Sequence, residues 1–330
     1  YTMTESGKSF QVFVKPISAL CNLKCRYCYY LDKIHLYPNQ KIFKMPFDVL
    51  ESYIMQHIEA CPDEVVRFSW HGGEPTLLGL GFYEKIVEIQ EKYRKEKRVT
   101  NGIQTNGTLL DEEWCQFLQR ENFAVGLSLD GPEEIHNKYR QTKTGHPSFN
   151  KTMNGYRLLQ KHGVDTDILC VVNDLNVTQP LKVYNFFKEI GAKYITFLPL
   201  VESEKESKNV DIMVSPEQWG DFLCQIFDEW LAKDIGVIKI QIIEEALRTA
   251  FNQEHSLCIF RPTCGDIPVL EHNGDLYSCD HYVDQAHLLG NIMETPLQQL
   301  LLSPSQTLFG EYKQTSLPEY CLECNVLELC

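Results

Sequence analysis

Three cysteines near the start of the chain have a spacing that suits a metal centre. They follow the pattern Cys21-x3-Cys25-x2-Cys28, in a loop after the first predicted strand. Three thiolates this close can each bind one iron of a [4Fe-4S] cube, whereas a cluster held only by protein takes four. One iron would keep an open position, the property that separates a reactive metal site from a structural one. A zinc site with a distant fourth ligand, or three buried thiols, would also fit this spacing.

Cysteine usage along the whole chain points the same way. The 330 residues include 13 cysteines, an odd number that fits complete disulfide pairing badly. A chain of this size does not need disulfides for stability, and its start lacks an apolar secretory segment. We therefore expect a reducing, cytoplasmic location, where clustered thiols bind metal or act in catalysis. Four cysteines without metal spacing are expected in the core: Cys61, Cys115, Cys170 and Cys224.

Composition and charge limit the partners of the chain. Hydrophobic residues make up 43% and charged residues 23%, and no apolar run approaches the roughly 18 residues that a membrane helix needs. The formal net charge is −14, because 31 Lys and Arg face 45 Asp and Glu. This field disfavours nucleic acid and anionic membranes, so small molecules or other proteins are the expected partners.

Strand and helix patterns alternate over the first two thirds of the chain, which is typical of parallel βα units. The expected strands are 11–15, 65–70, 102–104, 124–129, 167–172 and 194–200. The expected helices are 47–59, 82–95, 111–120, 149–161 and 181–190. Six strands are too few for a closed eight-unit barrel, so we predict a partial (β/α)6 barrel of the TIM type. Ligand sites in such folds form at the carboxyl ends of the strands, where polar turns such as 71–75 follow here.

The last quarter of the chain has a different character. Helices are expected over 216–233 and 241–251, and short hairpin-like pieces follow, with a turn at Asn273-Gly274. Six of the cysteines lie beyond residue 257. We therefore expect two domains: residues 1–255 with the partial barrel and its connecting helices, and residues 256–330 with an auxiliary metal site.

Two motifs together resemble the radical S-adenosylmethionine superfamily. One is Cys21-x3-Cys25-x2-Cys28 with Tyr27 before the third cysteine, and the other is Gly72-Gly73-Glu74-Pro75 after the second strand. The resemblance implies that the open iron chelates S-adenosylmethionine, which is cleaved to methionine and a 5′-deoxyadenosyl radical. It also implies a partial (β/α)6 barrel, in agreement with the count of strands.

Further motifs are similar, in order and spacing, to anaerobic sulfatase-maturating enzymes. They are Gln104-Thr-Asn-Gly-Thr108, Gly126-Leu-Ser-Leu-Asp-Gly-Pro132, Glu134-Ile-His-Asn137 and Cys279-Asp280-His281-Tyr282. The resemblance implies oxidation of a Cys or Ser of a sulfatase to Cα-formylglycine. It also implies five residues that contact S-adenosylmethionine: Tyr27 at the adenine, Gly73 at the methionine, and Ser128, Arg140 and Val201 around the rest of the molecule.

The resemblance assigns the C-terminal cysteines to two auxiliary [4Fe-4S] clusters in a SPASM-type domain. Cys258, Cys264 and Cys279 match the ligands of the first, and the set Cys321, Cys324 and Cys330 matches the ligands of the second. In the family one more cysteine completes each cluster, so we expect three clusters in the full-length protein and a sequence truncated here. A zinc knuckle over residues 321–330 is the alternative.

Asp280 directly follows one of these cysteines. The resemblance implies that Asp280 is the general base that takes the proton from the substrate thiol or hydroxyl, a role that needs hydrogen-bond reach to the heteroatom. Its neighbour His281 is expected to have a supporting or structural role. A turn or surface aspartate is the plainer interpretation.

The leading functional hypothesis is therefore a radical enzyme acting on a sulfatase polypeptide, with an electron donor such as a ferredoxin or flavodoxin. Another SPASM-type enzyme that crosslinks a precursor peptide is the first alternative. Such enzymes often carry an N-terminal peptide-binding domain, whereas about ten residues precede the first strand here. A non-catalytic iron-sulfur or zinc module is the second alternative, and it has no use for the Gly-Gly-Glu-Pro motif.

Overall fold

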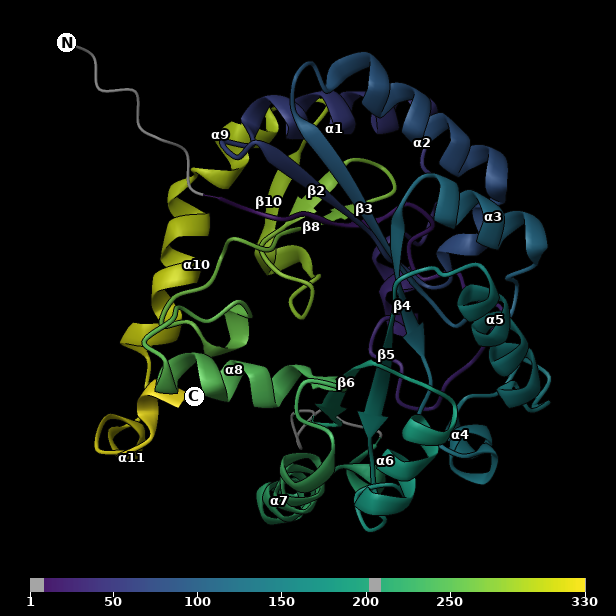
Figure 1. Cartoon of the computed structure of the whole chain (residues 1–330). Helices are drawn as coiled ribbons and strands as arrows, with labels where there is room; N and C mark the ends of the chain where they lie inside the picture. Colours follow the sequence, from purple (N-terminus) through teal and green to yellow (C-terminus); the bar gives the residue numbers. More distant parts are fainter. Residues whose placement is uncertain (1–8, 202–208, 330) are drawn as a thin grey trace. The chain divides into compact units, whose positions relative to one another are not determined.

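A computed structural model describes residues 9–201 and 209–329 of the chain. Its contacts divide the chain into two compact units. Figure 1 shows the chain coloured along the sequence. Unit 1 comprises Tyr1–Cys21, Tyr30–Ile103 and Arg248–Cys330, and unit 2 comprises Asn22–Tyr29 and Gln104–Leu247. The first and the last described residues, 9 and 329, therefore belong to the same unit.

Unit 1 contains a mixed sheet in which the first strand is central. β1 (Phe13–Lys15) pairs in parallel with β2 on one side and with β8 on the other. β3 continues the parallel part beyond β2, and β9 and β10 add an antiparallel part beyond β8. The bounds are β2 (Val65–Trp70), β3 (Arg98–Thr105), β8 (Val269–Glu271), β9 (Asp275–Tyr277) and β10 (Leu288–Asn291). The C-terminal hairpin is thus joined to the N-terminal strand by backbone hydrogen bonds.

Unit 2 contains a parallel sheet in which the strands follow one another in sequence order. Its strands are β4 (Phe123–Ser128), β5 (Thr166–Val172), β6 (Tyr194–Pro199) and β7 (Lys239–Ile240). Strand residues such as Leu127, Ile168 and Ile195 are fully or almost fully buried and pack against Phe187 and Phe222 from the helices. Parallel strands need this cover, which the crossover helices supply.

The helices have recognisable start signals. Asp111 accepts a hydrogen bond from the amide of Trp114 at the start of α3, and a capping box of Ser215 and Gln218 opens α7. The helices of unit 1 are α1 (Phe47–Ala60), α2 (Leu80–Tyr93), α9 (Leu297–Leu301), α10 (Pro304–Thr315) and α11 (Glu319–Leu322). Those of unit 2 are α3 (Glu112–Arg120), α4 (Glu133–Tyr139), α5 (Phe149–Lys161), α6 (Pro180–Glu189) and α7 (Pro216–Lys233), and α8 (Gln241–Ala250) ends in unit 1.

The six expected strands and five expected helices are all present, with small changes at their ends. β3 begins at Arg98, four residues earlier than expected, and β1 is limited to Phe13–Lys15. The hairpin around Asn273-Gly274 is confirmed as β8 and β9. The region after Cys258 is more helical than expected, because α9 and α10 follow the hairpin. None of the helices in the described part of the chain is long and apolar enough to cross a membrane.

The expectation for the four remaining cysteines is correct for three of them. Cys61, Cys115 and Cys170 are buried, but Cys224 is exposed, so its placement in the core was wrong. Phe222 and Ile226 on α7 form the buried face of that helix. Cys224 lies two residues from each, about 200° around the helix, and therefore points away from the core.

Candidate active site

The boundary between the two units runs through the first cysteine motif. Cys21 belongs to unit 1, and Cys25 and Cys28 belong to unit 2. All three side chains are partly exposed, unlike the buried Cys115 and Cys170. In unit 2 the loop is held in place by two backbone hydrogen bonds, from Lys24 to Gln141 (2.7 Å) and from Arg26 to Tyr139 (3.1 Å). Within unit 2, Cys25 and Cys28 are therefore accessible thiols on an anchored loop, which is what an iron-sulfur ligand needs.

The Gly-Gly-Glu-Pro turn after β2 is a tight backbone cradle in unit 1. The amide of Gly73 donates to the carbonyl of Ser18 (2.7 Å), and the amide of Glu74 donates to the carbonyl of Leu20 (2.8 Å). A Cβ atom on Gly73 would lie 2.0 Å from the carbonyl oxygen of Leu20, so only glycine fits. The buried carboxylate of Glu74 accepts hydrogen bonds from the amide and hydroxyl of Thr76 and begins the next helical turn. The motif thus fixes the loop that leads into the cysteine motif.

We predict that Gly73→Ala lowers the free energy of unfolding by about 1–3 kcal/mol, the usual cost of overpacking, because backbone must move to admit the methyl group. Urea denaturation followed by circular dichroism measures the change. Gly81→Ala is the matched control. Gly81 lies in α2, and a Cβ atom there would meet only the carboxylate of Glu84, at 4.0 Å. The control should be neutral or stabilising by about 0.5–1 kcal/mol. Equal stability of the two variants would contradict the steric argument.

Two of the residues expected to contact S-adenosylmethionine form a buried cluster with an aspartate in unit 2. The side chain of Arg140 makes two hydrogen bonds to the carboxylate of Asp130, at 2.9 and 3.0 Å. The hydroxyl of Tyr27 also donates to Asp130, and the guanidinium of Arg140 lies 5.4 Å from the centre of the Tyr27 ring. Burial raises the pKa of Tyr27 well above its ordinary value, so the phenol stays protonated.

The carboxylate of Asp130 is a partner of Arg140 that was not predicted from the sequence. The contact of Arg140 with S-adenosylmethionine, which the resemblance implies, stays a prediction. Asp130 was not singled out from the sequence, although it lies inside the quoted motif 126–132. A carboxylate at the end of a strand was the signal that pointed to it.

Ser128 and Val201, which are also expected to contact S-adenosylmethionine, lie in unit 2 outside the cluster of Tyr27, Asp130 and Arg140. The side-chain amide of Gln104 donates to the hydroxyl of Ser128 (3.2 Å) at the carboxyl end of β4. Gly126 makes room for this contact, since a Cβ there would lie 2.0 Å from the Gln104 amide oxygen. Val201 is 62% exposed, so its side chain is not part of the core.

The C-terminal cysteines form a second group in unit 1. Burial, with the neighbouring charges of Asp280, Cys258 and Cys264, raises the pKa of the Cys279 thiol to about 11. The ionised forms of Cys258 and Cys264 thus disfavour ionisation of Cys279, whereas a bound metal centre would favour it. Cys321 is partly exposed and Cys324 is exposed, and the two share a turn in which the Cys324 amide donates to the Cys321 carbonyl (3.1 Å). Cys330 lies outside the described residues.

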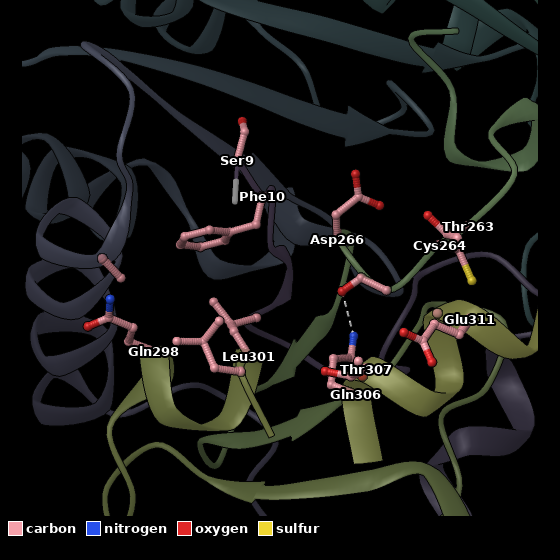
Figure 2. A pocket seen from close by; sticks show the side chains of 14 residues that line it. Ser9, Phe10, Thr263, Cys264, Asp266, Gln298, Leu301, Gln306, Thr307 and Glu311 are labelled. Atoms are coloured by element: carbon pink, nitrogen blue, oxygen red, sulfur yellow. Dashed lines mark hydrogen bonds between the residues drawn. The ribbon is translucent and has the colours of Figure 1, made fainter. Parts of the chain in front are cut away.

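Helix α10 holds the segments that carry these cysteines. The side-chain amide of Gln306 donates to the carbonyl of Gly265 (2.6 Å), next to Cys264, and to the carbonyl of Ser278 (3.2 Å), next to Cys279. Figure 2 shows Cys264 and Asp266 near this end of α10, with the bond from Gln306 as a dashed line.

Two further residues of α10 contact the segments that carry the cysteines: Gly310, one turn after Gln306, and Lys313, two turns after it. A Cβ on Gly310 would lie 2.3 Å from the Cys264 carbonyl oxygen, so glycine is needed for the close approach. The ammonium of Lys313 donates to the carbonyls of Cys258 (2.9 Å) and Ile259 (2.7 Å). Sequence reasoning missed α10, although Ser303-Pro304 with Gln306 is a typical helix start.

Within residues 9–201 and 209–329, no three His, Cys, Asp or Glu side chains are close enough to hold one metal ion. In a [4Fe-4S] cube each cysteine binds a different iron, so the thiols of a cluster need not converge on one point.

Asp280 is paired with a buried lysine in unit 1. Its Oδ1 atom lies 2.7 Å from the ammonium nitrogen of Lys15, the last residue of β1. The side chain of Lys15 is 3% exposed and that of Asp280 is 15% exposed. Lys15 was missed in the sequence, although a charged residue in the apolar run 12–15 of a central strand is a signal in itself. His281, which follows Asp280, is exposed.

Comparisons with known proteins agree with the motifs and the fold. Residues 16–187 match the Radical SAM superfamily, and residues 258–325 match an iron-sulfur cluster-binding domain of the SPASM type. The partial (β/α)6 barrel with a C-terminal iron-sulfur domain, expected from the sequence, is therefore confirmed as the fold class. The chain belongs to the radical SAM superfamily.

Relatives that match nearly the whole of this chain show which radical SAM enzymes it belongs with. The serine-type anaerobic sulfatase-maturating enzyme of Bacteroides thetaiotaomicron is 44% identical over 100% of this chain and 83% of its own length. The cysteine-type enzyme of Clostridium perfringens is 34% identical over 97% of this chain and 87% of its own length. The solved structure of anSMEcpe with bound AdoMet superposes with a TM-score of 0.90, at 34% identity, over 98% of this chain and 85% of that one. The chain is thus a member of the anaerobic sulfatase-maturating enzymes.

More distant structures share only the fold. Streptococcus suis SuiB bound to S-adenosylmethionine superposes with a TM-score of 0.68 at 17% identity, over 98% of this chain and 72% of that one. The relatives that are 34–44% identical, and not these distant structures, favour an enzyme of the maturating type over the alternative of a non-catalytic iron-sulfur or zinc module.

Proposed function

We propose that this enzyme oxidises a Cys or Ser side chain of an unfolded sulfatase segment to Cα-formylglycine. The observation that carries the proposal is the position of Asp280. A carboxylate directly after a predicted cluster ligand, largely withdrawn from solvent and paired with Lys15, is suited to accept one proton from a substrate. A structural turn residue would have no need of a buried lysine partner.

The cysteines would hold the cofactors of the reaction. Cys21, Cys25 and Cys28 would hold a [4Fe-4S] cluster with one open iron, where S-adenosylmethionine binds. When bound, this pair supplies the one-electron chemistry that removes a hydrogen atom from Cβ of the substrate residue. Cys258, Cys264 and Cys279 would contribute to one auxiliary cluster, and Cys321, Cys324 and Cys330 to another.

The remaining predicted residues would hold S-adenosylmethionine. Gly73 offers backbone at the end of β2, and Ser128 offers a hydroxyl at the end of β4. Tyr27 and Arg140 would contribute through the cluster that they form with Asp130, which fixes the ring and the guanidinium. Val201 has an accessible apolar side chain that suits a nucleoside.

We propose further that the enzyme accepts both Cys and Ser as the target residue. The relative that is 44% identical is a serine-type enzyme, whereas the cysteine-type relatives are 31–34% identical. The native anSMEcpe structure with AdoMet and Cp18Cys peptide has a TM-score of 0.88, which supports a peptide as the substrate class. We also propose a domain boundary near residue 255. The electron donor would be a ferredoxin or flavodoxin, and the location would be cytoplasmic.

Anaerobic turnover tests the proposal directly. The full-length protein is reconstituted with iron and sulfide and incubated with S-adenosylmethionine, dithionite and a sulfatase-motif peptide. Two peptides that differ only by Cys or Ser at the target position show which residue is oxidised. Mass spectrometry should detect the aldehyde, together with 5′-deoxyadenosine. A crosslinked peptide would instead support the alternative of a SPASM-type crosslinking enzyme.

We predict that the full-length protein binds three [4Fe-4S] clusters, or about twelve irons per chain. The reason is that nine cysteines occur in three groups of three, each of the kind that binds a cube. Anaerobic iron and sulfide analysis, with the visible absorption spectrum, measures the number. Zinc in place of iron, without a brown chromophore, would contradict the prediction.

A further inference from the structure

The buried lysine beside Asp280 has no part in the reaction as described so far. Lys15 lies in the middle of the unit 1 sheet, where β1 is hydrogen-bonded to β2 and to β8. The Lys15 side chain is almost fully removed from water, which is unfavourable for a charged group unless a partner compensates. The partner is the carboxylate of Asp280, at 2.7 Å. A lysine is rarely retained in such a place for packing alone.

The position of the ammonium is fixed from more than one side. Its nitrogen lies 4.4 Å from the centre of the Tyr30 ring, which attracts the cation through the ring face. The hydroxyl of Tyr30 in turn donates to Glu271 (2.5 Å), a fully buried carboxylate that also accepts from Ser18 (3.2 Å). Glu271 pairs in register with Lys15 across β1 and β8. The strand and this supporting network therefore leave Lys15 little freedom to move.

The neighbouring histidine does not compete for the same role. His71 follows β2 and stacks on Phe13, with ring centroids 4.3 Å apart. Burial and the nearby Lys15 lower the pKa of His71 to about 3, so the ring is neutral at neutral pH. Lys15 therefore supplies the positive charge that faces Asp280 from β1.

We propose that Lys15 is a positioning residue for substrate oxidation, because its ammonium holds the carboxylate of Asp280 in the direction from which it accepts the substrate proton. This inference rests on the proposed role of Asp280. The proton passes from the thiol or hydroxyl of the substrate to the carboxylate, and Lys15 acts only by holding that carboxylate. A base that must meet one heteroatom within hydrogen-bond distance gains from being held by a rigid strand, and a displacement of about 1 Å can cost about 10²-fold.

The test uses full-length protein, reconstituted anaerobically, with S-adenosylmethionine, dithionite and the Ser and Cys peptides. Lys15→Met, Lys15→Arg, Asp280→Asn and the double variant Lys15→Met/Asp280→Asn are compared with the parent. Lys85→Met, which removes a partly exposed lysine of α2 that pairs with Glu88, is the control for charge. The readouts are iron content, 5′-deoxyadenosine, formylglycine per 5′-deoxyadenosine, and peptide affinity by fluorescence anisotropy.

We expect Lys15→Met to retain its iron and its 5′-deoxyadenosine formation while formylglycine per 5′-deoxyadenosine falls about 10- to 10²-fold. Lys15→Arg should restore part of the yield, since the guanidinium can still form an ion pair with the carboxylate. The double variant should be no worse than Asp280→Asn alone, because Lys15 acts only through Asp280. Lys85→Met should match the parent.

Several results would overturn the inference. They are a parental yield from Lys15→Met, losses in the double variant that multiply, or a loss of iron or peptide affinity that accounts for the lower yield. If Lys15→Met does not fold, Lys15→Gln replaces it, with the same readouts and a smaller expected loss. A parent that cleaves S-adenosylmethionine but makes no formylglycine contradicts the proposed function itself, and is thereby distinguished from a failure of the role of Lys15.

Discussion

Replacing Cys21, Cys25 and Cys28 together with alanine is expected to abolish the formation of 5′-deoxyadenosine. The three thiols are the ligands that would hold the cluster with the open iron, and alanine has no group that can replace them. The loss should reach the detection limit of the assay. The auxiliary clusters should remain, because their cysteines lie in a different part of the chain, where Gln306 and Lys313 hold the ligand segments.

Two measurements separate this outcome from general damage. Iron analysis of the triple variant should fall by about four irons per chain, and no further. Cys224→Ala is the matched control, because Cys224 is exposed on α7 and has no predicted ligand role. Continued production of 5′-deoxyadenosine by the triple variant under dithionite would show that this motif does not cleave S-adenosylmethionine.

The parallel core was predictable from the sequence because its signals are local. Buried parallel strands are short apolar runs, and each is separated from the next by an amphipathic helix pattern. α5 and α7 begin and end at the expected residues, since Phe149–Lys161 and Pro216–Lys233 are strongly patterned. α10 was missed because its burial is limited to Gln306 and Gly310, so it lacks a clear apolar stripe.

The site was predictable only as far as its motifs extend. The cysteines and Gly73 could be found because a ligand set and a tight turn each need one residue type at fixed positions. The pairing of Asp130 with Arg140 spans only 10 residues of sequence. The pairing of Tyr27 with Asp130 spans 103 residues, and that of Lys15 with Asp280 spans 265. For the pairs that are distant in sequence, one sequence contains no information beyond the oddity of a charge in an apolar run.

Asp280→Asn is expected to separate cleavage of S-adenosylmethionine from oxidation of the substrate. The amide keeps the shape of the carboxylate but does not take up a proton, so formylglycine should fall by about 10²–10⁴-fold, the typical effect of a lost general base. 5′-Deoxyadenosine should still form, because Cys21, Cys25 and Cys28 are untouched. The ratio of the two products, measured by liquid chromatography and mass spectrometry, gives the result.

A folding control and a comparison of Cys and Ser peptides make this test of Asp280 sharper. The side-chain amide oxygen that Asp280→Asn introduces can still accept a hydrogen bond from Lys15, so the variant should fold and keep its iron, which iron analysis checks. The loss should be milder on a Cys peptide than on a Ser peptide, since a thiol with a pKa near 8.5 gives up its proton far more readily than a hydroxyl. Equal losses on the two peptides would indicate that Asp280 positions the peptide. A parental ratio of formylglycine to 5′-deoxyadenosine would refute the assignment and leave Asp280 as a turn residue beside Cys279.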